Sequence, residues 1–328
     1  MGQLVDGVWQ DQPLSTAQTG GKFVRKDSSF RHWITADGSA GPTGKGGFKA
    51  EPGRYHLYVS YACPWAHRTL IVRSLKKLDD LISVSVVDYF MGDRGWTFSN
   101  KDGATPDVIN GADFLSEVYV KADPEYTGRV TVPVLWDKQQ NTIVSNESSE
   151  IIRMLNSAFV EWADNSTDLY PTALQGEIDL VNERIYSAIN NGVYKCGFAS
   201  KQEAYEGAFA ALFGALDEME DRLSRQRYLV GDQITEADWR FFTTLVRFDA
   251  VYVGHFKCNR QRIADYPNLS NYLRELYQVP GVAGTVNMLH IKRHYYQSHE
   301  TVNPTRIVPV GPDLDFDGPH DRGRFSAG

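Results

Sequence analysis

A single cysteine between a strand pattern and a helix pattern constrains this chain more than any other feature. Residues 55–61 alternate aromatic, aliphatic and small side chains as a strand does, and Pro64 begins a helical pattern directly after Cys63. Proline is favoured in a first helical turn because its missing N–H has no partner to lose there. We therefore expect Cys63 at a helix N-terminus, where free backbone N–H groups and the positive end of the helix dipole favour a thiolate.

The segments after this cysteine predict a thioredoxin-like α/β domain. A helix and a buried parallel strand follow it, and a β-hairpin and a second helix come after a long interruption. These elements are expected at residues 64–78, 82–87, 129–137, 142–145 and 150–159. The interruption, residues 88–128, is longer than connections in compact domains and indicates a functional or ligand-ordered insertion. The predicted order is β-α-β-β-β-α with this long insertion.

The hairpin and the helix after it carry candidate binding residues. Pro133 lies inside a strand pattern, which indicates an edge strand or a cis bond at a bend. In a thioredoxin-like domain such a strand ends beside the cysteine, so Val132 is expected to pair with an extended peptide. Ser148 and Glu147 open the next helix and are expected to bind the carboxylate and ammonium of a γ-glutamyl group. Simple helix capping also explains these two residues.

The cysteine site has one thiol. Ala66 stands where a C-x-x-C dithiol would have its second cysteine, so thiol exchange needs a partner from elsewhere. Cys196 and Cys258 are the internal candidates, although a buried, idle cysteine is the commoner role. An external thiol is therefore the better candidate, and glutathione, the obvious thiol of the cytosol, is the expected co-substrate.

Beyond a polar linker at residues 164–171 the pattern becomes helical throughout. Apolar residues recur at three-to-four spacing, and Thr235 to Asp238 matches a capping box. Helices are expected at 173–190, 202–225, 235–252, 269–277 and 282–295. The predicted organisation is an irregular N-terminal extension (1–50), the thioredoxin-like domain (51–163), an all-α domain (171–300) and an irregular or partly disordered tail (301–328).

Composition excludes several function classes. The net charge of −7 argues against nucleic-acid binding, and no run is long and apolar enough for a membrane span. The first residues lack the basic and apolar regions of a secretory signal. Three widely spaced cysteines form no disulfide framework and fit a reducing compartment. We therefore expect a cytoplasmic protein with neither nucleic-acid nor membrane partners.

Histidines and tyrosines in the helical part of the chain are further candidates for chemistry. His290 and His294 lie four residues apart, but Ile291 stands where a zincin motif needs glutamate, so no metal is expected. Four tyrosines fall near predicted helix ends, and they are either interior residues or proton donors to an aromatic oxygen. They are Tyr194, Tyr252, Tyr295 and Tyr296.

Together these residues resemble the Xi class of glutathione transferases, the glutathionyl-hydroquinone reductases. The resemblance covers nearly the whole chain and includes the extended termini and the insertion. Its motifs are GGKF (20–23), YACPWAHR (61–68), GWTF (95–98), RVTVPVLWD (129–137), SNES (145–148), NGVYK (191–195) and TLVRFD (244–249).

The resemblance implies a glutathione transferase fold and a homodimer formed through the helical domains. It implies that Cys63 is catalytic and that Tyr194 and Tyr295, the latter beside Tyr296, line a hydroquinone pocket. The implied glutathione contacts are Trp96, Arg129, Val132, Glu147 and Ser148.

The implied reaction is the glutathione-dependent reduction of S-glutathionyl-hydroquinones through a Cys63–glutathione mixed disulfide, with no metal or nicotinamide. An Omega-like thiol transferase or dehydroascorbate reductase remains an alternative, since it uses the same cysteine without a ring pocket. A non-enzymatic interaction module is a second alternative. A conjugating transferase is disfavoured, because a cysteine attacks the glutathione sulfur instead of stabilising its thiolate.

Overall fold

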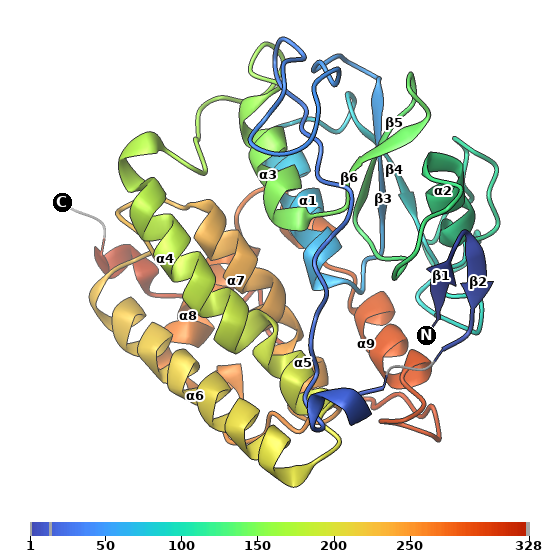
Figure 1. Ribbon diagram of the computed structural model, residues 1–328. Coiled ribbons are helices and arrows are strands. Elements are labelled where there is room, and N and C mark those ends of the chain that lie inside the picture. Colours follow the sequence, from blue (N-terminus) through green and yellow to red (C-terminus); the bar gives the residue numbers. More distant parts are fainter. Residues whose placement is uncertain (1, 13–14, 326–328) are drawn as a thin grey trace. The chain divides into compact units, whose positions relative to one another are not determined.

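The computed structural model describes residues 2–12 and 15–325, which form two compact units (Figure 1). Unit 1 takes residues 2–12, Asp27–Thr167 and Thr285–Ser298. Unit 2 takes residues 15–26, Asp168–Gly284 and the described residues from His299 onward. Both units therefore combine segments that are distant in sequence. The helix expected at 282–295, which we had assigned to the all-α domain, falls in unit 1.

Unit 1 is built on a four-stranded sheet with the strand order β4-β3-β5-β6. Strand β3 pairs in parallel with β4 and antiparallel with β5, which pairs antiparallel with β6. Helices α1 and α3 pack together on one face and α2 lies on the other (Figure 1). The elements are β3 (Tyr55–Val59), α1 (Pro64–Leu75), β4 (Ser83–Val86), α2 (Leu115–Ala122), β5 (Val134–Asp137), β6 (Thr142–Ser145) and α3 (Ser148–Ser157). The predicted thioredoxin-like order is confirmed.

The first hairpin strand is shorter than predicted. The ladder begins at Val134 instead of Arg129, because Pro133 has no N–H to donate to a neighbouring strand. The peptide bond between Val132 and Pro133 is cis. All five residues of β3 are buried, so the strand that leads to Cys63 is the centre of the core.

The insertion is ordered by its own hydrogen bonds. Asp107, which is 5% exposed, accepts from the Tyr58 hydroxyl at 2.9 Å. The same carboxylate accepts from three backbone N–H groups, those of Ile109, Asn110 and Ala112. A buried carboxylate satisfied in this way fixes the loop against β3. A functional or ligand-ordered role of the insertion stays a prediction.

The N-terminal segment, expected to be irregular, contains a β-hairpin. Strand β1 (Gln3–Val5) pairs with β2 (Val8–Gln10). The two residues between them, Asp6 and Gly7, have φ values of 47° and 72°, as a two-residue hairpin turn requires.

Helix α9 (Met288–Ser298) begins at Met288 instead of Val282. The Asn287 side chain accepts from the His290 N–H at 3.0 Å and so caps the first turn. His290 and His294 each bind a backbone carbonyl of the insertion, those of Asp102 and Tyr89, both at 2.8 Å. These bonds attach α9 to unit 1.

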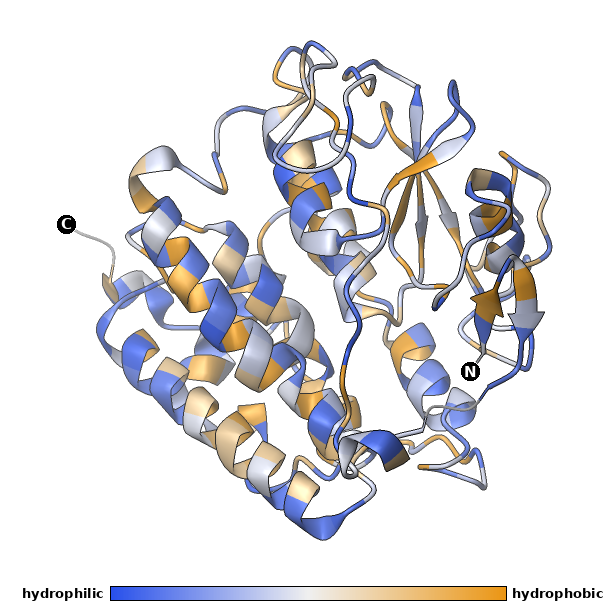
Figure 2. Ribbon diagram, in the orientation of Figure 1, coloured by the Kyte–Doolittle hydropathy of each residue, from blue (hydrophilic) through white to orange (hydrophobic). Residues whose placement is uncertain are grey.

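Unit 2 is a set of helices in which α7 is the most buried. All twelve residues of α7 are buried, and Figure 2 shows hydrophilic and hydrophobic residues on different faces of α6. The predicted capping box is confirmed: Asp238 accepts from the Thr235 N–H at 2.8 Å. The α-helices are α4 (Gln175–Ile185), α5 (Gly192–Gly197), α6 (Gln202–Arg225), α7 (Glu236–Arg247) and α8 (Pro267–Tyr277). No helix among the described residues has the length and apolar character to cross a bilayer.

The tail is irregular, as expected, but it is anchored; its last three residues, 326–328, lie outside the described residues. Arg322 is fully buried and donates to the carbonyls of Leu223, Gln226 and Arg227 at 2.6 to 2.7 Å. These carbonyls lie at the C-terminal end of α6, where a cation also interacts favourably with the helix dipole.

We expect Arg322→Ala to lower the free energy of unfolding by about 3 kcal/mol, because three buried carbonyls lose a charged donor. Urea unfolding followed by circular dichroism measures the change, and the tail should also be cut faster by protease. Arg324→Ala is the matched control, since that side chain is 39% exposed and pairs with Asp321. Equal destabilisation by the two variants would contradict the anchoring role.

Candidate active site

Cys63 is the N-cap residue of α1, and Pro64 occupies the first helical position. A turn after β3 places it there: the Cys63 N–H donates to the Ser60 carbonyl at 3.1 Å. The Cys63 carbonyl accepts the first helical hydrogen bond, from the His67 N–H at 3.0 Å. The thiol is half-buried, and its Sγ donates to the Val132 carbonyl at 3.5 Å. The structure thus brings together the two residues that the sequence placed beside each other.

The start of α3 is tied to α1. Arg68, which is 1% exposed, donates through Nη1 to the Ser148 Oγ at 3.4 Å. Glu147 is the N-cap residue of α3 and accepts from the Ser149 N–H at 3.0 Å and the Ser28 hydroxyl at 3.0 Å. Burial alone raises the pKa of Glu147, but the hydrogen bonds from Ser149 and Ser28 and the charge of Arg68 outweigh it, so the pKa lies below its usual value. The capping alternative is therefore confirmed for Glu147, whereas its role in glutathione binding stays a prediction.

Trp96 lies in the insertion and stacks on α9. Its ring and that of His294 are 4.9 Å apart at 20°. The Trp96 backbone is fixed as well, since its carbonyl accepts from the Leu115 N–H at 2.9 Å. Trp96 is 6% exposed. Sequence reasoning weighed His294 only as a metal ligand and missed this contact.

Arg129 is half-buried, and its Nη1 donates to the Gly2 carbonyl at 3.1 Å. Burial lowers the pKa of the guanidinium. Sequence analysis did not anticipate that the N-terminal segment would reach this residue.

The predicted ring-pocket tyrosines belong to different units. Tyr295 and Tyr296 lie on α9 in unit 1 and are 1% and 8% exposed. Tyr295 packs edge-on against His294, with ring centroids 5.4 Å apart. Tyr194 lies on α5 in unit 2 and is 9% exposed.

Within unit 2, Tyr194 belongs to an aromatic cluster. The Arg25 guanidinium lies 5.0 Å from the centroid of its ring and donates to the Asn191 side chain at 2.8 Å. Tyr252 closes a π-helical turn, Phe248–Tyr252, a distortion that is frequent at functional sites. The rings around Tyr194 are Phe23, Phe198, Tyr252 and Phe256, at centroid distances of 5.5 to 6.3 Å. Phe23 was signalled by the GGKF motif, whereas Arg25 was missed.

The other two cysteines are buried together in unit 2. Cys196 and Cys258 are 2% and 0% exposed, and their side chains interact. Burial, and then the contact with Cys196, raises the pKa of the Cys258 thiol well above its usual value. A thiol in that state is a poor nucleophile, which agrees with the idle role expected for it.

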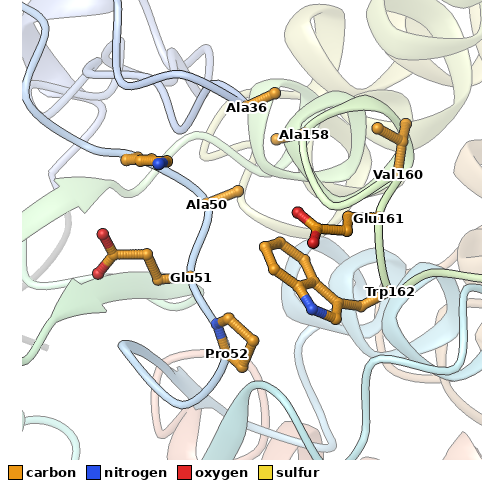
Figure 3. A pocket seen from close by; sticks show the side chains of 9 residues that line it. Ala36, Ala50, Glu51, Pro52, Ala158, Val160, Glu161 and Trp162 are labelled. Carbon is orange, nitrogen blue, oxygen red and sulfur yellow. The ribbon is translucent and has the colours of Figure 1, made fainter.

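Unit 1 also has a cavity of about 240 Å³ that Cys63 does not line (Figure 3). Trp162, Pro52 and Glu161 are among its lining residues, which include none of the predicted catalytic or glutathione-binding residues. Across residues 2–12 and 15–325 there is no cluster of three or more His, Cys, Asp or Glu side chains suited to a metal ion.

The sheet order and the cysteine at the start of α1 define a protein of the glutathione transferase type. The family model "Glutathione S-transferase, N-terminal domain" matches residues 62–158, and "Glutathione S-transferase, C-terminal domain" matches 202–275. Glutathionyl-hydroquinone reductase YqjG of Escherichia coli is 59% identical over 98% of both chains. Its glutathione-bound structure covers 98% of this chain and 99% of its own with a TM-score of 0.91.

Two further similar proteins belong to the same family. Glutathionyl-hydroquinone reductase PcpF of Sphingobium chlorophenolicum is 56% identical over 97% of this chain and 98% of its own. A Xi-class structure from Natrialba magadii is 52% identical, with a TM-score of 0.92 over 99% of this chain and 98% of its own. The chain belongs to the glutathione transferase family and, within it, to the Xi class of glutathionyl-hydroquinone reductases.

We expect Glu147→Gln to cost about 1 kcal/mol of stability at pH 7, as loss of a charged N-cap does. Because the pKa of Glu147 is lowered in the folded state, the carboxylate contributes its full stabilisation when the pH is above the ordinary pKa of a glutamate. This contribution is lost as the pH falls through the lowered pKa. The difference from the unaltered protein should therefore shrink towards pH 3. Urea unfolding across this range measures it, and a matching trend in Glu161→Gln, an exposed glutamate, would contradict the assignment.

Proposed function

We propose that this protein reduces S-glutathionyl-hydroquinones to hydroquinones with glutathione, through a mixed disulfide on Cys63. The observation that carries the proposal is the Cys63 thiol at the N-terminus of α1, 3.5 Å from the Val132 carbonyl. Position 66, where a dithiol motif would have its second cysteine, is an alanine. The names of the two reductases that are more than half identical to this chain support it.

In the first step the Cys63 thiolate attacks the glutathione sulfur of the substrate. An aryl carbon is normally a poor leaving group, but tautomerisation to a ketone places a proton on the carbon that bears sulfur. When the S–S bond forms, the C–S electron pair then passes to the ring oxygen. Protonation of that oxygen releases the hydroquinone and leaves Cys63 joined to glutathione.

In the second step a glutathione thiolate attacks the mixed disulfide and releases oxidised glutathione and the Cys63 thiolate. The ring is reduced and two glutathione sulfurs are oxidised, so the cycle balances without a metal or a nicotinamide. A thiolate is favoured at the N-terminus of α1 both as nucleophile and as leaving group.

The glutathione-binding site, called the glutathione seat below, is proposed to consist of Trp96, Arg129, Val132, Glu147 and Ser148. Val132 would pair with the peptide backbone, while Ser148 and Glu147 would hold the γ-glutamyl carboxylate and ammonium. The Ser148 bond to Arg68 supports this role, because it keeps positive charge beside the expected carboxylate. The glutathione-bound structure of the E. coli relative also supports a glutathione site.

Tyr194 and Tyr295 are proposed to donate to the ring oxygens and stabilise the negative charge that develops as the hydroquinone leaves. A cytoplasmic location, expected from the cysteine usage, and a homodimer formed through the helical domains, implied by the family resemblance, remain part of the proposal.

The rival enzyme function is an Omega-like thiol transferase or dehydroascorbate reductase. It needs the same cysteine and the same glutathione-binding residues, but no tyrosines that donate to the ring oxygens of an aromatic substrate. A purely structural interaction module would need neither. The experiments below separate these possibilities.

We expect the protein treated with a glutathionyl-hydroquinone to gain one glutathione on Cys63, as read by intact-protein and peptide mass spectrometry. Cys63→Ser should gain none and lose activity by more than about 10³-fold, because no other group replaces the nucleophile. Cys258→Ala is the matched control and should keep the adduct, since that thiol is fully buried. An unmodified Cys63 at every pH tested would rule out the first step.

We expect Tyr295→Phe to lower kcat for a glutathionyl-hydroquinone by about 10²-fold through loss of a donor to the developing oxyanion. Turnover of a small glutathione mixed disulfide should not change, because that reaction has no ring oxygen. Tyr296→Phe, one residue along α9, is the control and should affect neither. If the small disulfide is the faster substrate of the unaltered protein, the Omega-like function is favoured instead.

A further inference from the structure

The Trp9 ring packs against two glycines that adjoin predicted glutathione contacts. A Cβ placed on Gly2 would lie 2.5 Å from the Trp9 Cζ2 atom. A Cβ placed on Gly95 would lie 2.7 Å from its Cη2 atom. Side chains essentially never approach so closely, so the ring packs directly on both backbones. One half-buried side chain of the N-terminal hairpin thus touches two positions that are far apart in the sequence.

The first position adjoins Arg129. The Gly2 carbonyl is the acceptor for the Arg129 Nη1 atom at 3.1 Å. A half-buried guanidinium is costly unless acceptors satisfy it, so the placement of Gly2 helps to define where Arg129 points. By packing on Gly2, Trp9 supports the residue that carries this carbonyl.

The second position adjoins Trp96. Gly95 has a φ of 78° and closes a turn with Gly92, and the next residue is Trp96. The Trp9 Nε1 donates to the Asp93 carbonyl at 2.8 Å, inside the same turn. Trp9 therefore fixes this turn both by a hydrogen bond and by packing.

The hairpin itself is fixed to the segment that leads into Arg129. Leu4 exchanges two backbone hydrogen bonds with Gly128, both 2.9 Å long, and is 1% exposed. The Gly7 N–H donates to the Tyr126 carbonyl at 3.1 Å. The Asp6 N–H donates to the Thr127 hydroxyl at 2.8 Å. Three consecutive residues before Arg129 are thus paired with β1 and its turn.

We propose that Trp9 is a positioning residue for glutathione binding, acting through Arg129 on one side and the turn before Trp96 on the other. The inference rests on the proposed function in so far as Arg129 and Trp96 contact glutathione. It adds that the N-terminal hairpin, which lies outside the thioredoxin-like sheet, completes the glutathione seat. Trp9 touches neither the reacting sulfur of Cys63 nor the ring tyrosines by any contact described above, so its effect should fall on glutathione affinity.

The test measures glutathione affinity directly, by calorimetry on the full-length protein without hydroquinone. Trp9→Ala should weaken binding about tenfold, which corresponds to about 1.4 kcal/mol. Trp9→Phe keeps much of the packing but loses the bond to Asp93, so it should weaken binding by about threefold. In turnover, Trp9→Ala should raise KM for glutathione while kcat at saturating glutathione stays within about twofold.

Coupling to Arg129 distinguishes positioning from general loosening. In an Arg129→Ala background the effect of Trp9→Ala should fall below its tenfold value, because one of the two routes is already lost. Val8→Ala, on the same hairpin and 64% exposed, is the local control, and Trp162→Ala removes a tryptophan elsewhere in unit 1. Both controls should bind glutathione like the unaltered protein.

Unchanged affinity in a folded Trp9→Ala variant would overturn the inference, as would an equal loss in Trp162→Ala or full additivity with Arg129→Ala. If Trp9→Ala does not fold, the Trp9→Phe value decides, and unchanged binding in that variant would overturn the inference. Failure of the proposed function appears differently: the unaltered protein would bind glutathione and respond to Trp9→Ala, yet leave glutathionyl-hydroquinones unreduced.

Discussion

The guanidinium of Arg68 joins the two helix N-termini on which the candidate site depends. It lies on α1, one turn beyond Cys63, and donates to Ser148 at the start of α3. A buried guanidinium is stable only when acceptors and charges satisfy it, and Glu147 supplies the opposite charge. The Arg68 guanidinium carbon also lies over the Trp65 ring, 4.6 Å from the ring centroid. Arg68 therefore links α1, the helix that begins after Cys63, to the start of α3, so a shift of either helix would disturb this contact.

The parts of this site that could be predicted from sequence are those specified by local rules. Proline after cysteine determines where α1 begins. The capping box at Thr235 and the spacing of α6 are likewise local and are confirmed. The fold class followed from these elements, because the order of strands and helices leaves few alternatives. The roles of the tyrosines and of the glutathione contacts stay predictions.

The parts that could not be predicted depend on contacts between distant residues. Helix α9 was expected with the helical domain because its spacing is that of any amphipathic helix. It belongs to unit 1 and is bonded there through imidazoles to Asp102 and Tyr89, contacts which no periodicity reveals. The same bonds give the histidines a role other than metal binding. Arg25 was missed because its segment has no regular period, and its partners lie far along the chain. Trp9 belongs to a hairpin whose Asp6-Gly7 turn is a signal that sequence does carry, but its contacts with Asp93 and Gly95 lie far along the chain.

The division of residues between the units bears on substrate choice. The cysteine, the five proposed glutathione contacts and the hairpin that supports two of them all belong to unit 1, as does Tyr295. Sulfur exchange therefore uses groups from one unit, which explains why a thiol transferase function is the natural rival. Tyr194 and its aromatic neighbours belong to unit 2, whose local packing includes a π-helical turn and the Arg25 guanidinium. Because these features have no part in thiol exchange itself, they are the ones that we propose to select an aromatic leaving group.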